Sequence, residues 1–450
     1  MNLRKISFYI IVFVMIWTPL QDTILSLIFR FYQADNLKLL LILKETLIII
    51  ALLLLIINKI LVGKIPFSRL EIFAFLFLLI STLHLLFVRP EGVPLITTFT
   101  TFRAIILPIL FVHVGKFLNC SIKEFKNLTK IVFIISVFSV IFGIIEMLIP
   151  TDLFWNGPFL NLHGFLTRIK GLQEYSGGFV KGVPANFWGF IGLRRMAGFH
   201  ASPLGISYYL ITPIVLLATN LNKMNKKILF LFLVFGLLLT ETRAAILVTF
   251  ISLFIYFVDF RQLLSNMKVN KQFLFLFIFF MFLFLVLLTI SEEIQNFIMF
   301  SLTGKEGRIL GHIRSVTLGM KHSSETLIVG KGFGTAGSWA ALQGSKVGYG
   351  GESAYIQIFI PTGGLNFFIF LCWWISIYLY LKNKTKIFST NLEMFKLYKA
   401  FLSLQIAFFL TGFMSEQIQA FTATHNFWIL TGVVLGLKNS SEELKRIKII

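Results

Sequence analysis

The polar segment of residues 291–352 holds side chains whose types suit phosphate chemistry. Four of its basic residues lie within a short span: Arg308, Arg314, Lys321 and Lys331. His312 lies between the two arginines, and Glu352 stands where the next apolar stretch begins. A guanidinium group binds phosphate through paired hydrogen bonds, and a carboxylate beside it can accept a proton. The segment therefore predicts an active-site loop that handles a phosphate-bearing substrate, although Glu352 is equally suited to capping the helix that follows.

Two arginines form a second candidate for anion binding. Arg194 and Arg195 precede an apolar stretch that begins near Pro203, so the N-terminus of that helix would point toward them. Arginines beside a helix N-terminus favour an anion site. The alternative is that both side chains reach toward the membrane surface and only anchor the helix.

Three ionisable residues lie inside apolar sequence. Glu241 and Arg243 stand in LLLTETRAAILV, and Arg103 stands about a turn deep in TTFTTFRAIILPIL. Charged side chains are costly in a bilayer and usually mark a function there. The alternatives are a local Glu–Arg pair that closes a turn at 240–243 and an Arg103 side chain that extends to the membrane surface.

The composition is that of an all-α polytopic membrane protein. The chain has 450 residues, of which 57% are hydrophobic and 14% are charged, whereas a soluble domain is about a quarter charged. Its net charge of +21 is spread over short loops between apolar runs, which excludes nucleic acid as a partner. We expect twelve transmembrane helices at 6–22, 39–58, 70–88, 99–117, 130–149, 203–219, 227–240, 244–259, 272–290, 353–380, 398–413 and 424–437.

The charge distribution predicts the orientation of these helices. Loops on the side of both termini carry a net charge of +18, and loops on the other side carry +3. Basic loops stay in the cytoplasm, so both termini are expected there, and the long loops 150–202 and 291–352 are expected outside. The segments 227–240 and 244–259 are short and would alternatively form one helix with a polar break at TETR. The chain shows no second domain, and the Gly-rich texture of the long loops predicts ordered turns over a cavity.

Several catalytic classes are excluded by what the chain lacks. In the turn GKGFG at 330–334 no Ser or Thr follows Lys331, so the turn is not a nucleotide-binding loop. No pair of histidines has metal-ligand spacing, so no metal or cofactor is expected. Cys120 and Cys372 are far apart in the chain and predict no disulfide.

Four elements, taken in order, resemble the O-antigen polymerase and ligase superfamily. They are Arg195-Met196-Ala197-Gly198 followed by Pro203, then LLLTETRAAILV, then Arg308 followed by GKGFG, and last ESAYIQIFIPTGGL from Glu352. The match covers roughly residues 190–370. The family implies a multispan bundle of the GT-C type in the bacterial inner membrane, with a large late periplasmic loop.

The resemblance implies a function and a role for each residue. The chain would be a polymerase of O-antigen or capsule repeat units that uses glycan linked to undecaprenyl pyrophosphate, with a chain-length regulator as a candidate partner. Pyrophosphate would be bound by the matched arginines, Arg195, Arg243 and Arg308, or Arg314 in place of the last. Glu352 would be the catalytic base, and Arg194, Arg103, Glu241 and His312 are further candidates.

Two other functions stay open at this point. An O-antigen ligase would use the same donor but transfer it to the lipid A core, and ligases of this family usually carry His-Asn where this chain has Glu352 and Ser353. That departure favours the polymerase. A lipid-linked glycan flippase or transporter would be expected to show internal repeats and charges at the membrane midplane, and no repeat is evident.

Overall fold

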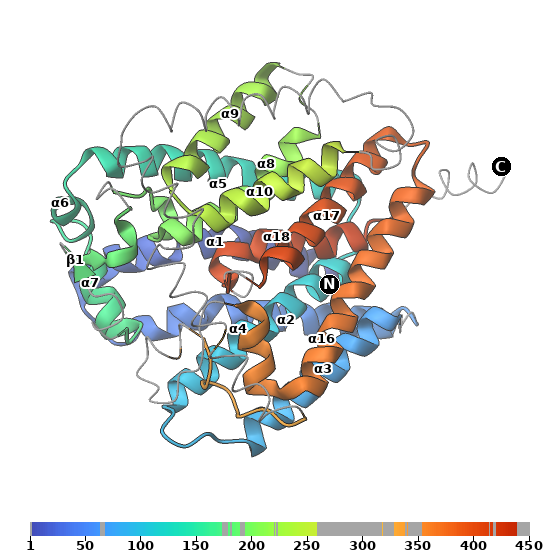
Figure 1. Cartoon of the computed structure of the whole chain (residues 1–450), viewed down its shortest axis with the longest axis horizontal. Helices are drawn as coiled ribbons and strands as arrows, with labels where there is room; N and C mark the ends of the chain where they lie inside the picture. The colour runs from blue at the N-terminus through green and yellow to red at the C-terminus, as the bar shows by residue number, and fades with distance from the viewer. Residues whose placement is uncertain are drawn as a thin grey trace.

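The fold is mostly helical, and every apolar segment that the structure describes forms an α-helix (Figure 1). The computed structural model describes residues 2–63, 68–172, 179–180, 182–189, 194–219, 221, 224–258, 317, 328–337, 340, 353–413, 415–416 and 420–438. The predicted helix at 272–290 lies outside these residues, and each of the other predicted segments coincides with a helix.

Among the residues that the structure describes, seven helices are long and apolar enough to cross a membrane. They are α1 (Leu3–Tyr32), α2 (Leu37–Leu61), α3 (Arg69–Phe87), α4 (Leu95–Phe117), α5 (Ile122–Leu148), α16 (Ala354–Ile387) and α17 (Leu392–Thr411). Four shorter apolar helices are also described: α8 (Pro203–Ala218), α9 (Met224–Leu239), α10 (Arg243–Phe257) and α18 (Phe421–Leu435). The total of twelve membrane spans therefore stays a prediction.

The loops of the bundle gather at two ends. One end, here called the loop end, holds the start of α2, the connection from α3 to α4 and the described part of residues 149–202, which is joined to α1 by hydrogen bonds from Asn161 to Ser26 and from Thr23 to Phe199. At the opposite end, Ser121 and Glu124 form a capping box that starts α5, and Arg4 pairs with Glu124. A serine followed three residues later by glutamate is a sequence signal for a helix start, so this boundary follows from local sequence.

Glycines allow a close backbone contact between α4 and α18. A β-carbon on Gly432 would lie 2.1 Å from the carbonyl oxygen of Val112, and one on Gly436 would lie 2.1 Å from that of Lys116. On the other side of the contact, a β-carbon on Gly115 would lie 2.4 Å from the Ile429 oxygen. In a membrane, where apolar surface alone does not drive association, small residues spaced by four let helix backbones approach closely.

The first long loop folds into an ordered cap at the loop end. It contains α6 (Thr151–Trp155), α7 (Leu162–Gly164), a π-helical turn (Phe165–Ile169), a hairpin of β1 (Phe179–Val180) and β2 (Val183–Pro184), and the 3-10 turns η2 (Ala185–Phe187) and η3 (Gly198–His200). Trp155 and Phe165 are fully buried in a small core with Phe29 of α1. The described part of this loop consists of short helices, turns and a hairpin, and the cavity that the loop would cover stays a prediction.

Helices α9 and α10 are two helices joined by a turn, as Figure 1 shows. Glu241 has a φ of 48°, in the left-handed region, so the chain cannot continue as a helix through TETR. The alternative of one long helix is therefore wrong, because Thr240 and Glu241 form a turn and Thr242 has an extended backbone.

Helix α16 contains a sharp break that the single predicted span does not anticipate. Gly363 has a φ of 81° and a ψ of 167°, which interrupts the helix two residues after Pro361. The two parts then bend toward each other, since the rings of Tyr355 and Phe367 lie 5.9 Å apart, whereas twelve residues of straight helix span about 18 Å. The bend is visible in the orange helix of Figure 1.

The turn GKGFG fills the gap that this break creates. The backbone N–H of Lys331 donates to the carbonyl of Ile360 over 2.8 Å, and that of Gly332 donates to Pro361 over 3.1 Å. A β-carbon on Gly330 would lie 2.2 Å from the Pro361 oxygen. The glycine-rich turn thus has a structural role: it supplies donors to carbonyls that the broken helix leaves without partners.

Candidate functional site

Arg195 joins two of the sequence elements into one structure. Its Nε donates to the carbonyl of Thr240 over 2.7 Å and its Nη2 to the hydroxyl of Thr242 over 2.7 Å, while Nη1 donates to the carbonyl of Asn186 over 2.9 Å. The N–H of Met196 also donates to Leu239 over 3.0 Å. We call residues 194–200 and 240–243 the paired turns. Residues 45 apart in sequence meet here through a buried guanidinium group.

The paired turns fix where α10 begins. Arg243 is the first residue of that helix and is exposed, so its side chain is accessible at the loop end. The carboxylate of Glu241 approaches Gly189 so closely that a β-carbon there would lie 1.9 Å from its Oε2. Glycine at position 189 leaves the space that this carboxylate occupies.

Glu146, near the end of α5, holds the first of the paired turns from the other side. Its Oε1 accepts hydrogen bonds from the backbone N–H groups of Ala197 and Gly198, the latter over 3.1 Å, and its side chain is fully buried. Its Oε2 lies 3.4 Å from Nη2 of Arg194. Arg194 also donates to the carbonyl of Ile149 over 2.8 Å. The two adjacent arginines therefore serve different partners.

The end of the first turn is equally well anchored. The N–H of Phe199 donates to Ser139 over 3.1 Å, and its carbonyl accepts from the hydroxyl of Thr23 over 2.7 Å. Beside it, the His200 ring packs on Tyr209, with centroids 4.8 Å apart. Burial, with a smaller effect of His425, lowers the pKa of His200 to about 3, so its imidazole is neutral at physiological pH.

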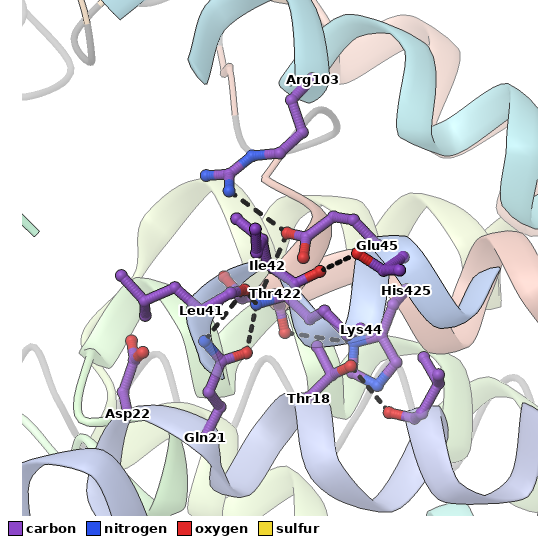
Figure 2. A network of polar contacts seen from close by, with 12 residues as sticks. Thr18, Gln21, Asp22, Leu41, Ile42, Lys44, Glu45, Arg103, Thr422 and His425 are labelled. Atoms are coloured by element: carbon purple, nitrogen blue, oxygen red, sulfur yellow. Dashed lines mark hydrogen bonds and ion pairs between the residues drawn. The ribbon is translucent and has the colours of Figure 1, made fainter. Parts of the chain in front are cut away.

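A second polar group lies inside the bundle, between α1, α2 and α4, and Figure 2 shows it from close by. Lys44 donates to the side chain of Gln21 and, over 3.2 Å, to the carbonyl of Leu41. Glu45 Oε1 lies 3.7 Å from Lys44 Nζ and 3.4 Å from Arg103 Nη1. We call Gln21, Lys44, Glu45 and Arg103 the ion cluster. Arg103 thus turns toward a carboxylate of α2, which supports the inward of its two predicted orientations.

A second ion pair, between α1 and the first long loop, lies next to the ion cluster. Asp22 follows Gln21 in α1, and Lys170 Nζ lies 2.6 Å from its Oδ2. The structure thus places ionisable groups of α1, α2, α4 and the first loop in one region. Glu146, Lys44 and Glu45 escaped the sequence analysis, although the signal was available: each is an ionisable residue within an apolar helix.

The start of α16 is also tied to its neighbours. The N–H of Ala354 donates to the carbonyl of Gly412 over 2.9 Å, and Gln357 donates to Glu416. Tyr208 of α8 donates to Ser415 over 2.7 Å. The start of α16 and helix α8 therefore both contact the segment at the end of α17.

The structure brings together only part of the predicted site. Arg195 and the turn that carries Glu241 and Arg243 meet directly, and Arg194 lies beside them but is bound to Glu146. Arg103 belongs to the separate ion cluster. The remaining candidates lie outside the described residues: Arg308, His312, Arg314 and Glu352.

The comparisons with known proteins assign no family. The sequence matches no protein-family model, and a search of curated proteins found no significant match. Within the described residues, no group of three or more His, Cys, Asp and Glu side chains is arranged to hold a metal ion. The function must therefore be argued from the arrangement of the described residues and the motif order.

Proposed function

We propose that this chain is a polysaccharide repeat-unit polymerase of the bacterial inner membrane. It would transfer glycan from undecaprenyl pyrophosphate to a sugar hydroxyl of another lipid-linked repeat unit. The observation that carries the proposal is the contact of Arg195 with TETR, which joins two elements of the motif order into one place at the loop end. The proposed orientation puts this end outside, with both termini in the cytoplasm.

The described contacts indicate different roles for Arg195 and Arg243. Arg195 is buried and hydrogen-bonded to Thr240, Thr242 and Asn186, so it positions the turn. Arg243 is exposed at the start of α10 and is the better placed of the two to contact a pyrophosphate. A positive helix N-terminus beneath a guanidinium group adds to the attraction for an anion.

The chemistry then follows from charge. The bond between the anomeric carbon of the donor glycan and its pyrophosphate oxygen breaks, and the pyrophosphate keeps the electron pair. The hydroxyl oxygen of the acceptor forms the new glycosidic bond, and its proton passes to Glu352. Arg243, with Arg308 as its proposed partner, stabilises the charge on the leaving group. Arg195 preserves the geometry in which Arg243 does so.

A flippase for lipid-linked glycan is the second candidate, because the ion cluster supplies the intramembrane charges that a transporter uses. The two functions predict different products when the gene is deleted. Without a polymerase, single lipid-linked repeat units accumulate on the outer side. Without a flippase, they accumulate on the cytoplasmic side.

Complementation of a deletion strain tests the polymerase. Wild-type protein should restore a ladder of polymer lengths, whereas Glu352→Gln and Arg243→Gln should insert normally and yield single repeat units. Glu393→Gln is a matched control, because Glu393 forms an exposed ion pair with Lys126 at the opposite end. A full ladder from Glu352→Gln would reduce that carboxylate to a helix cap, and a full ladder without the protein would overturn the function.

A further inference from the structure

The carboxylate of Glu45 has unused capacity for hydrogen bonds. It lies near two cations, yet neither of its buried oxygens accepts a hydrogen bond from the described residues. An ionised carboxylate has about four lone-pair sites for donors. Buried polar atoms are nearly always satisfied in folded proteins, and those that are not demand an explanation. Glu45 is therefore placed to receive a donor that the described protein does not supply.

The cations of the ion cluster differ in their surroundings. Lys44 is occupied by Gln21 and Leu41, and its side chain is 3% exposed. The Arg103 side chain is 29% exposed, against 9% for Glu45, so the cluster is most accessible at the Arg103–Glu45 pair. That pair presents an acceptor and a donor next to each other.

The chemistry of this pair selects its ligand. A sugar hydroxyl donates one hydrogen bond and accepts others, so vicinal hydroxyls can bind Glu45 and Arg103 together. A fully ionised phosphate offers only acceptors and would be repelled by the Glu45 carboxylate. A lipid tail offers neither donor nor acceptor. The pair is complementary to a carbohydrate.

The position of the pair agrees with such a ligand. Phe102, the residue before Arg103, packs edge-on against Phe333 of the GKGFG turn, with ring centroids 5.2 Å apart. The second long loop therefore reaches α4 one residue from Arg103. We propose that Glu45 and Arg103 form a sugar-binding subsite that holds the glycan of a lipid-linked substrate, an inference that rests on the proposed function.

The test compares two lipids on the full-length protein in nanodiscs. One is the lipid-linked oligosaccharide fraction extracted from a strain that lacks this protein, and the other is undecaprenyl pyrophosphate without sugar. Glu45→Gln should weaken binding of the glycan lipid about tenfold, the effect of one charged hydrogen bond, and leave binding of the sugar-free lipid unchanged. Glu393→Gln should change neither. Equal binding by Glu45→Gln and wild type, or an equal loss for both lipids, overturns the subsite.

A double variant guards against a purely structural effect. Glu45→Met with Arg103→Met removes both charges together and leaves neither without its partner. It should lose glycan-lipid binding selectively, and normal binding would show that the pair is only a structural ion pair. The ladder of polymer lengths in the complemented strain tests the proposed function separately. A wild-type protein that binds glycan lipid but makes no ladder would overturn the polymerase and keep the subsite.

Discussion

The paired turns and the ion cluster use their polar groups in opposite ways. In the paired turns, Arg195 and Glu146 direct their side chains at backbone groups of the protein itself. In the ion cluster, Glu45 faces two cations but accepts no hydrogen bond from the described residues. The side chains of the paired turns therefore stabilise the local fold, whereas the Glu45 carboxylate of the ion cluster can still accept hydrogen bonds from a ligand. Substitutions should therefore reduce stability mainly in the first region and binding mainly in the second.

The largest loss of stability is expected from Arg195→Ala. It removes three described hydrogen bonds and strips donors from the carbonyls of Thr240 and Asn186. The free energy of unfolding should fall by about 4 kcal/mol. Lysine should recover only a small part, because it lacks the planar fork. Thermal unfolding of the purified protein measures the effect, and the exposed Arg168→Ala serves as control. Equal melting temperatures for Arg195→Ala and the control would contradict the positioning role.

Glu146→Ala should come next. It leaves the N–H groups of Ala197 and Gly198 without their acceptor and Arg194 without its carboxylate. We expect the free energy of unfolding to drop by about 3 kcal/mol, and Glu146→Gln to lose about half as much because one acceptor oxygen remains. The same thermal assay applies. A glutamine variant less stable than the alanine variant would show that this account of the turn is wrong.

In the ion cluster, Arg103→Met should reduce stability less than the substitutions in the paired turns. Its partner lies 3.4 Å away and the Arg103 side chain is partly exposed, so the loss of stability should be about 1.5 kcal/mol or less. Polymer formation should nevertheless fail in the complemented strain. If the substitution destabilised the protein as much as Arg195→Ala, the ion cluster would be a second structural anchor.

The smallest effect is a pH dependence that originates in the paired turns. Burial lowers the pKa of His200 to about 3, whereas the unfolded chain binds this proton near pH 6.5. Between these values the unfolded state holds more protons, so stability falls as the pH drops below 6.5. From pH 7 to 5.5 the contribution is about 1 kcal/mol. His200→Phe should remove this contribution, so that the melting temperature of the variant changes less than that of wild type between pH 7 and 5.5. The same change of melting temperature with pH in both proteins would exclude the mechanism.

Local sequence predicts much of the fold. Apolar runs locate the helices that the structure describes, and the Ser121–Glu124 signal marks a helix start. The break in α16 had a signal as well, since Pro361 and Gly363 both interrupt helices, but apolar residues on both sides concealed it. Hydropathy reports burial in the membrane and is insensitive to a bend within one helix.

The candidate site is harder to predict because its contacts are not local. Nothing in the sequence near Arg195 shows that its guanidinium group meets Thr240, which only the packing of α5, α8 and α9 determines. Lys44 and Glu45 stand in an apolar run and were detectable as intramembrane charges, but their partner Arg103 lies on another helix. Residue types suggest chemistry, whereas tertiary packing decides which groups share it.

The break in α16 ties the geometry of this helix to the GKGFG turn of the second long loop. If residues 331 and 332 withdrew, the carbonyls of Ile360 and Pro361 would lose the donors they now use. Beyond the break, α16 packs along α3, where Asn366 donates to Ser81 over 2.9 Å, and continues to Ile387 at the opposite end. A displacement of residues 331 and 332 would therefore act on a helix that runs from the loop end to the opposite end of the bundle.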